Sequence, residues 1–263
     1  MTHKSSLHVG LNYTISPITT LKGCINDAKS LSQLFSSYGY YVMLRTDDVK
    51  KVSVPFIKSC VRPTSLEEVI YTTKFGMIKD MQNLVTNANG PIVFTFSGHG
   101  TQVKDISRDE GDALDEAIVP VDAPITGVIT DDVIFNILKE SSYPVFCLFD
   151  SCHSGSIADL PCSYDPKTKT ITQTKEDASC KIVCISGCRD EETSADTENI
   201  ESVSGNCGAL TACFLAAVKS LPKDFTPKQL ADDISQRLGK NNLTQNCVLS
   251  VSQTALMDAP LAL

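Results

Sequence analysis

A cysteine and a histidine each follow an apolar run, and together they could carry out nucleophilic catalysis. Cys152 comes three residues after the run 143–149, and His99 lies within Ser-Gly-His-Gly after the run 91–96. A thiol is mostly protonated at neutral pH, so it becomes a good nucleophile only when a base takes its proton or stabilises its anion. We therefore predict that Cys152 is a nucleophile and that His99 is its base.

The two apolar runs are the elements that must bring these side chains together. Both are rich in β-branched and aromatic residues and end in small and polar ones, which is typical of buried strands whose carboxyl ends reach a surface. Ligands bind at that edge of an open parallel sheet. A single free cysteine is more often a core residue. The second strand end, which carries His99, favours a catalytic pair.

The remaining pattern predicts an α/β fold with a mostly parallel sheet, because strands alternate with helical stretches. We expect strands at residues 7–13, 40–45, 181–186 and 246–252, short strands at 118–121 and 127–130, an exposed hairpin within 161–175, and helices at 24–38, 71–85, 133–140, 208–218 and 226–238. In the last helix, Thr226 and Gln229 have the spacing of a capping box.

Length and composition predict one compact domain over residues 1–263. The chain is 42% hydrophobic and 21% charged, as in ordinary folded proteins. It has no apolar run long enough for a membrane span and no secretion signal, so we expect a cytoplasmic monomer. A net charge of −8 argues against nonspecific nucleic-acid binding. The eleven cysteines are scattered, which favours reduced thiols.

Several stretches in order along the chain resemble those of the metacaspases, the caspase-like cysteine peptidases of protists, fungi, plants and bacteria. The matching stretches are residues 21–27, 96–100, 115–122, 129–132, 150–156, 159–161, 185–188 and 193–196. The arrangement is most similar to the type I members, except that we expect no separate prodomain of the kind common in them. His99 also precedes Cys152 by about 50 residues, the separation given for this pair in caspases. The resemblance implies a caspase-like three-layer α/β/α sandwich and a cysteine endopeptidase that cleaves after Arg or Lys.

The resemblance also implies a specificity pocket and an oxyanion site. Residues matching Cys24, Asp27, Ser97 and Asp150 form the pocket, and the backbone N–H groups of Gly100 and Cys152 are the candidates that would stabilise the oxyanion. Alternation along each strand places Asp150 and Ser97 on the same face as their catalytic neighbours. Without the dyad, Asp27 would be interpreted as a helix N-cap and Asp150 as an ordinary residue at a strand end.

A calcium site is the second implication of the resemblance. Asp115, Asp131, Asp132 and Asp159 match its positions, and carboxylate oxygens are the ligands that Ca²⁺ prefers. Spacing alone leaves two simpler roles open. The acidic stretch 105–116 could be a solvated loop, and Asp131 and Asp132 could cap the helix that follows them.

Two other functions remain open at this point. A protein that keeps the fold but has lost the chemistry would act as a binding or scaffold module. A peptidase that cleaves after Asp would need a basic pocket, which the sequence near Cys152 and His99 does not contain. The sequence also indicates no third residue that would orient His99.

Overall fold

The fold comes from a computed structural model of the chain. The structure describes residues 3–14, 16–48, 70–104, 114–151, 157–187, 196–198, 206–241, 247–261 and 263. The predicted nucleophile, Cys152, lies outside these ranges.

Eight strands form the central sheet, and five of them are parallel. The order is β2 (Tyr40–Thr46), β1 (Lys4–Gly10), β3 (Ile92–Ser97), β7 (Val145–Asp150), β10 (Ile182–Ser186), β13 (Val248–Val251), β8 (Cys162–Asp165) and β9 (Thr170–Gln173). The first five are mutually parallel, and each of the last three runs antiparallel to its neighbour. The mostly parallel sheet predicted from the sequence is therefore confirmed.

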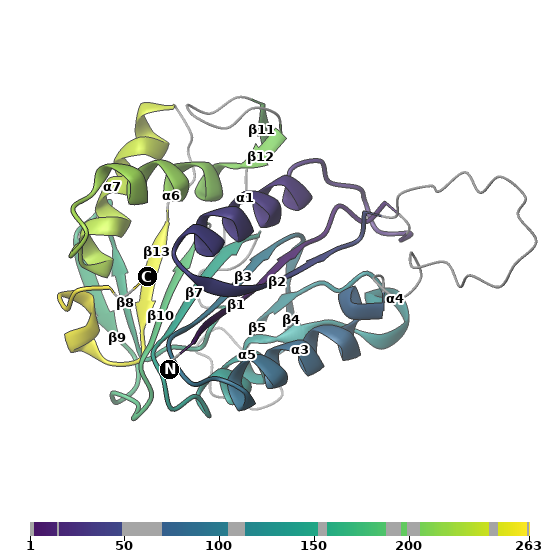
Figure 1. The fold of residues 1–263 in the computed structure, drawn as a ribbon, viewed down its shortest axis with the longest axis horizontal. Coiled ribbons are helices and arrows are strands. Elements are labelled where there is room, and N and C mark those ends of the chain that lie inside the picture. The colour runs from purple at the N-terminus through teal and green to yellow at the C-terminus, as the bar shows by residue number, and fades with distance from the viewer. Residues whose placement is uncertain are drawn as a thin grey trace, which may run out of the picture.

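Helices cover both faces of this sheet and complete three layers. One face carries α1 (Cys24–Ser37), α6 (Ala209–Ser220) and α7 (Pro227–Lys240), and the opposite face carries α3 (Lys74–Thr86) and α5 (Asp131–Leu138) (Figure 1). Along β3, Phe94 and Phe96 pack into the core on the α3 side, while Val93 packs into the core on the α1 side. Burial on both faces explains why the central strands are continuous apolar runs.

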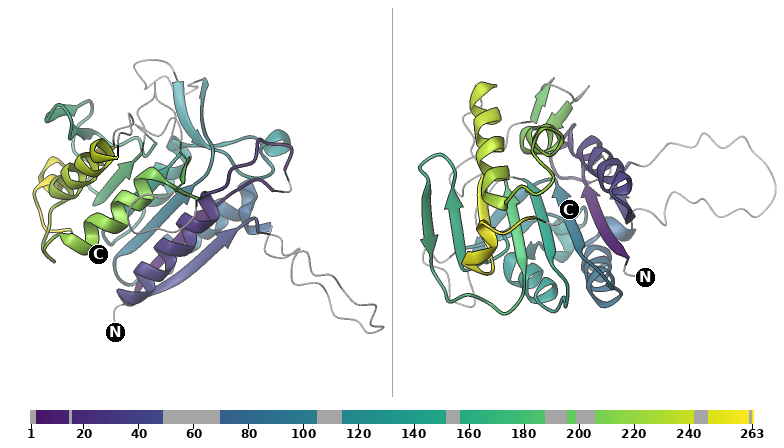
Figure 2. Two further views of the ribbon diagram at one scale, coloured as in Figure 1. Left: turned by 90° about the horizontal axis from the view of Figure 1, so that it is seen from above. Right: turned by 60° about the vertical axis from the view of Figure 1, so that its left-hand side comes forward.

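The predicted hairpin within 161–175 is confirmed, but it belongs to the central sheet. Its first strand, β8, pairs with β13, and its second strand, β9, forms the edge (Figure 2). Cys162 and Tyr164 of β8 are buried, whereas every residue of β9 is exposed. The sequence therefore predicted the hairpin but underestimated the burial of its first strand.

Shorter elements surround the sheet. They are η1 (Ile70–Thr72), β4 (Gly100–Lys104), β5 (Leu114–Ile118), α4 (Ala123–Thr126), β6 (Ile129–Thr130), β11 (Asp196–Glu198), β12 (Asn206–Gly208) and η2 (Thr254–Met257). The strands β4, β5 and β6 form an antiparallel sheet directly after His99. The prediction of a strand at 118–121 was wrong beyond Ile118, and β4 was not predicted, because Gly-Thr-Gln-Val-Lys has only one large apolar residue.

The capping box of α7 is confirmed. The Thr226 hydroxyl accepts the Gln229 N–H at 3.2 Å, and the Gln229 side chain accepts the Thr226 N–H at 2.9 Å. Among the described residues, no helix has both the length and the apolar character needed to cross a bilayer.

His8 should make the stability of the fold depend on pH. It is fully buried on β1, its Nδ1 lies 2.9 Å from the Thr95 hydroxyl, and burial lowers its pKa from 6.5 to about 3. Between these values the unfolded chain binds the extra proton, so stability is lost as the pH falls below about 6.5, by about 2 kcal/mol at pH 5. Urea unfolding of wild type and His8→Gln at pH 7 and pH 5 measures this loss.

The matched control for this prediction is His3→Gln, because His3 is exposed. The difference in unfolding free energy between the two pH values should shrink in His8→Gln and stay at the wild-type value in His3→Gln. Equal pH dependence in all three proteins would contradict the prediction.

Candidate functional site

The ends of β3 and β7 bring the two predicted catalytic segments together. The strands are parallel neighbours with Ser97 opposite Asp150, and the Gly98 N–H donates to the Asp150 carbonyl at 3.4 Å. His99 lies two residues beyond Ser97, and Cys152 two residues beyond Asp150. The segments that carry the two members of the predicted dyad therefore begin at the ends of two neighbouring strands.

The imidazole of His99 is oriented by a backbone carbonyl that sequence analysis missed. Its Nε2 lies 2.7 Å from the Thr19 carbonyl oxygen, in the segment between β1 and α1. A carbonyl can only accept a hydrogen bond, so Nε2 carries the proton and Nδ1 is left as the basic nitrogen. Every residue has a backbone carbonyl, so no residue type in the sequence indicated this contact.

The four predicted pocket residues lie at the carboxyl ends of neighbouring strands and on the helix packed beside them. Gly10, Ser97 and Asp150 are in register across β1, β3 and β7. Cys24 opens α1 and is buried, and its carbonyl oxygen lies only 2.2 Å from the place of a β-carbon on Gly10. Only glycine at position 10 therefore lets the start of α1 pack this closely against β1.

The carboxylates of Asp27 and Asp150 converge on the start of α6. Asp27 accepts the Gly208 N–H at 3.0 Å, and Asp150 accepts the Thr211 N–H at 2.9 Å. Both side chains are buried, 2% and 6% exposed. The first N–H groups of a helix have no partners within the helix and carry partial positive charge, so the start of α6 supplies hydrogen-bond donors to both carboxylates.

This geometry overturns the interpretation of Asp27 as an N-cap of its own helix. The N-cap of α1 is Gly23, and Asp27 bonds instead to Gly208, far along the chain. Its side chain therefore links α1 to the segment that opens α6.

Gly208 leaves the space that these carboxylates occupy, and this gives a testable prediction. A β-carbon there would lie 2.0 Å from an Asp150 oxygen and 2.9 Å from an Asp27 oxygen. Gly208→Ala should therefore displace Asp150 and lower kcat/KM for Arg and Lys reporter peptides by about 100-fold, the scale for a misplacement of about 1 Å. Steady-state kinetics measure the loss.

The control is Gly239→Ala on α7, where an added β-carbon has nothing within 4 Å. This variant should keep wild-type kinetics. A Gly208→Ala protein with unchanged kinetics would show that the two carboxylates do not form part of the substrate site.

The proposed oxyanion residue Gly100 and three of the four proposed calcium ligands lie in or beside the antiparallel sheet after His99. Gly100 opens β4 opposite Ile118 of β5. Asp115 is buried on β5, and Asp131, also buried, accepts the N–H groups of Glu116 at 3.3 Å and Asp132 at 2.8 Å. The N-cap position of α5 itself is Thr130, so Asp131 and Asp132 lie in the first turn of the helix.

Asp159 lies apart from those residues and already has a cationic partner. It has a φ of 44°, and its carboxylate pairs with the Lys175 ammonium at 2.5 Å. Within the described ranges, no three His, Cys, Asp or Glu side chains are grouped closely enough to hold a metal ion. The oxygen donors suit calcium, but the four carboxylates are not gathered at one point.

Five of the buried cysteines are poor nucleophiles. Burial raises the pKa of the thiols of Cys147, Cys180, Cys184 and Cys247, and it raises that of Cys213 to about 12. Since the thiolate is the reactive form, these residues are inert at neutral pH.

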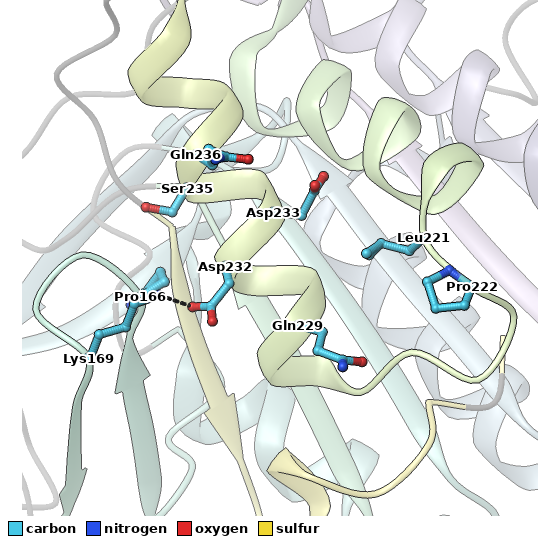
Figure 3. Close-up of a pocket in the computed structure, with 9 residues that line it drawn as sticks. All are labelled: Pro166, Lys169, Leu221, Pro222, Gln229, Asp232, Asp233, Ser235 and Gln236. Atoms are coloured by element: carbon cyan, nitrogen blue, oxygen red, sulfur yellow. Dashed lines mark hydrogen bonds and ion pairs between the residues drawn. The ribbon is translucent and has the colours of Figure 1, made fainter.

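A pocket of about 560 Å³ lies away from the predicted site (Figure 3). Residues of α7, the loop after α6 and the turn between β8 and β9 line it, and Lys169 pairs there with Asp232 at 2.8 Å. None of the lining residues belongs to the predicted dyad, pocket or calcium set.

Comparison with known families gives one match that spans more than half of the chain. Residues 4–161 match the family described as metacaspase, peptidase C14 domain. This range includes both strands that lead to the predicted dyad, and it ends before the segment at 206–211 that binds the carboxylates.

Curated relatives agree with that match. Metacaspase-1 of Kluyveromyces lactis is 29% identical over 84% of this chain and 60% of its own length. Metacaspase-1 of Schizosaccharomyces pombe is 30% identical over 99% of this chain and 70% of its own. For Metacaspase-1 of Candida glabrata the identity is 36%, over 62% of this chain and 40% of its own. The chain therefore spans about half the length of several relatives.

The similarity to a solved structure concerns the fold alone. The crystal structure of protein GSU0716 from Geobacter sulfurreducens superposes with a TM-score of 0.66 over 98% of this chain and 97% of that chain, at 20% identity.

Proposed function

Because this chain belongs to the metacaspase family, we propose that it is a cysteine endopeptidase that cleaves peptide bonds after arginine or lysine. The observation that carries this proposal is the convergence of Asp27 and Asp150 at the strand end beside His99. Two buried carboxylates at one place favour a cationic partner, and an acidic substrate side chain would meet like charge.

In the proposed mechanism His99 acts through Nδ1, since Thr19 holds the proton on Nε2. Nδ1 accepts the Cys152 proton while the sulfur attacks the scissile carbonyl carbon. The backbone N–H groups of Gly100 and Cys152 stabilise the oxyanion. His99 then protonates the leaving amine, and water hydrolyses the acyl-enzyme.

Peptide hydrolysis tests this function directly. Three reporter peptides that differ only in Arg, Lys or Asp before the scissile bond should be offered to the wild type with calcium and with chelator. Cleavage of the Arg and Lys peptides but not the Asp peptide is expected. Preferred cleavage after Asp would contradict the pocket assignment, and no cleavage of any peptide would favour the scaffold alternative.

We propose further that calcium activates the enzyme through Asp115, Asp131, Asp132 and Asp159. The support is the family position of these carboxylates and the preference of Ca²⁺ for oxygen ligands, while Asp159 is paired with Lys175 in the structure. Because Lys175 must give up this carboxylate before a metal can use it, we expect weak, near-millimolar affinity.

The calcium proposal gives its own prediction. Asp131→Ala together with Asp132→Ala should remove the response of hydrolysis to calcium while Cys152 still reacts with iodoacetamide. Lys175→Met should bind calcium several-fold more tightly than wild type in titration calorimetry, because the competing cation is gone. Full wild-type activity in chelator, or an unchanged calcium response in the double variant, would refute the metal assignment.

A further inference from the structure

Tyr13 contacts His99 through both its hydroxyl group and its ring. The fully buried Tyr13 hydroxyl accepts the His99 backbone N–H at 2.8 Å and donates to the Val119 carbonyl at 2.7 Å. The centroids of the Tyr13 and His99 rings lie 4.8 Å apart, and the ring planes make an angle of 37°. One side chain thus touches both the backbone and the imidazole of the predicted base.

The hydroxyl occupies a particular place in the β4–β5 ladder. The pair before Gly100 and Ile118 is His99 and Val119, and the Val119 N–H donates directly to the His99 carbonyl at 3.0 Å. The His99 N–H and the Val119 carbonyl are joined through the Tyr13 hydroxyl. This hydroxyl lies between them, accepting the hydrogen bond from the His99 N–H and donating one to the Val119 carbonyl. Both backbone polar groups of His99 are therefore fixed to the same neighbour.

Tyr13 is itself held in an uncommon conformation. Its φ is 58°, in the left-handed region that a bulky residue rarely adopts. The fully buried Asp47 carboxylate accepts the N–H groups on both sides of it, from Asn12 at 2.8 Å and from Thr14 at 3.0 Å. Such conformations persist where the surroundings over-determine them, and they cluster at functional sites.

Because position 98 is glycine, there is space beside His99 for the Tyr13 hydroxyl. A β-carbon at position 98 would lie 2.8 Å from the Tyr13 hydroxyl oxygen and 2.6 Å from the ring of Phe96. The glycine before the predicted base therefore leaves room for both the Phe96 ring and the Tyr13 hydroxyl.

From these contacts we infer that Tyr13 is a positioning residue, held by Asp47, that fixes the orientation of His99 toward Cys152. This role rests on the proposed function, because it requires His99 to be the base. Tyr13 contacts the His99 ring but transfers no proton and forms no bond in this mechanism, and it acts only through the position it gives the imidazole.

Tyr13→Phe tests the inference, since it removes the hydroxyl and keeps the ring. We expect kcat for the Arg reporter to fall about 10- to 100-fold with KM within about twofold of wild type, the scale for a misplaced catalytic group. The matched control is Tyr164→Phe, which also removes a buried tyrosine hydroxyl, here bonded to Asp232 at 2.8 Å on α7. Its kcat should stay within about twofold of wild type.

A second measurement separates positioning from loss of folded protein. The rate of Cys152 alkylation by iodoacetamide should be followed against pH, because pairing with His99 lowers the pKa of the thiol. In Tyr13→Phe the midpoint should move up toward the ordinary thiol value of about 8.5, and Asp47→Asn should move it in the same direction. A smaller folded fraction would lower the amplitude without moving the midpoint.

Identical alkylation profiles in wild type and Tyr13→Phe would overturn the inference, as would equal losses of kcat in Tyr13→Phe and Tyr164→Phe. If wild type cleaves no reporter, the proposed function fails, whereas a shifted alkylation midpoint in Tyr13→Phe would still establish the positioning role.

Discussion

Replacing Cys152 by alanine should abolish hydrolysis of Arg and Lys reporters, with a loss on the order of 10⁴-fold or more. The physical reason is that the proposed mechanism forms the acyl intermediate on the Cys152 sulfur, which alanine lacks. His99→Ala should be nearly as damaging, because Cys152 then loses the base whose Nε2 is held by Thr19. Steady-state kinetics measure both losses, and circular dichroism verifies the fold.

Cys184→Ala is the control for the loss of a thiol. Cys184 is buried in the core on β10, and burial raises its pKa well above the ordinary value. This variant should keep wild-type kcat/KM. Mass spectrometry after limited alkylation should find the label on Cys152; label found instead on Cys24, or activity retained in Cys152→Ala, would refute the dyad.

Replacing Asp27 or Asp150 by alanine should weaken transition-state binding of Arg and Lys substrates by about 2–5 kcal/mol. Each change leaves a buried substrate cation with one partner fewer. Each also removes the acceptor of a backbone N–H at the start of α6, from Gly208 or from Thr211. The ratio of kcat/KM between wild type and variant, measured for the Arg, Lys and Asp reporters, tests this prediction.

Asp80→Ala is the matched control for the loss of a buried carboxylate. Asp80 is 4% exposed on α3 and pairs with Arg45 at 2.6 Å, on the opposite face of the sheet. Its replacement should lower the melting temperature and leave substrate preference unchanged. If Asp27→Ala and Asp80→Ala had the same effect on the preference for Arg, the pocket assignment would be wrong.

The sequence predicted the strands that position the site because those strands are buried on both faces. Apolar runs that end in Ser-Gly-His-Gly and in Asp-Ser-Cys have both a clear hydrophobic pattern and a clear boundary. The same pattern predicted that the two strand ends lie together, and the structure pairs Ser97 directly with Asp150 on neighbouring strands. Local propensity likewise predicted the capping box of α7.

Contacts through backbone atoms could not be predicted in this way. The Thr19 carbonyl and the N–H groups of Gly208 and Thr211 contact His99 and the two carboxylates. Backbone groups have the same chemistry at every residue, so only the three-dimensional path of the chain selects them. The bridge from Tyr13 to His99 depends in addition on a left-handed backbone conformation at Tyr13, which the sequence does not indicate.

The attachment of Asp27 and Asp150 to the start of α6 has a consequence for how the protein is made. During synthesis the N-terminal part of a chain emerges first, so both residues of the dyad leave the ribosome well before residues 206–211. Until that later segment docks, the two carboxylates have neither the Gly208 N–H nor the Thr211 N–H as partner. A nascent chain therefore contains Cys152 and His99 before the carboxylates of the proposed pocket have their partners at the start of α6.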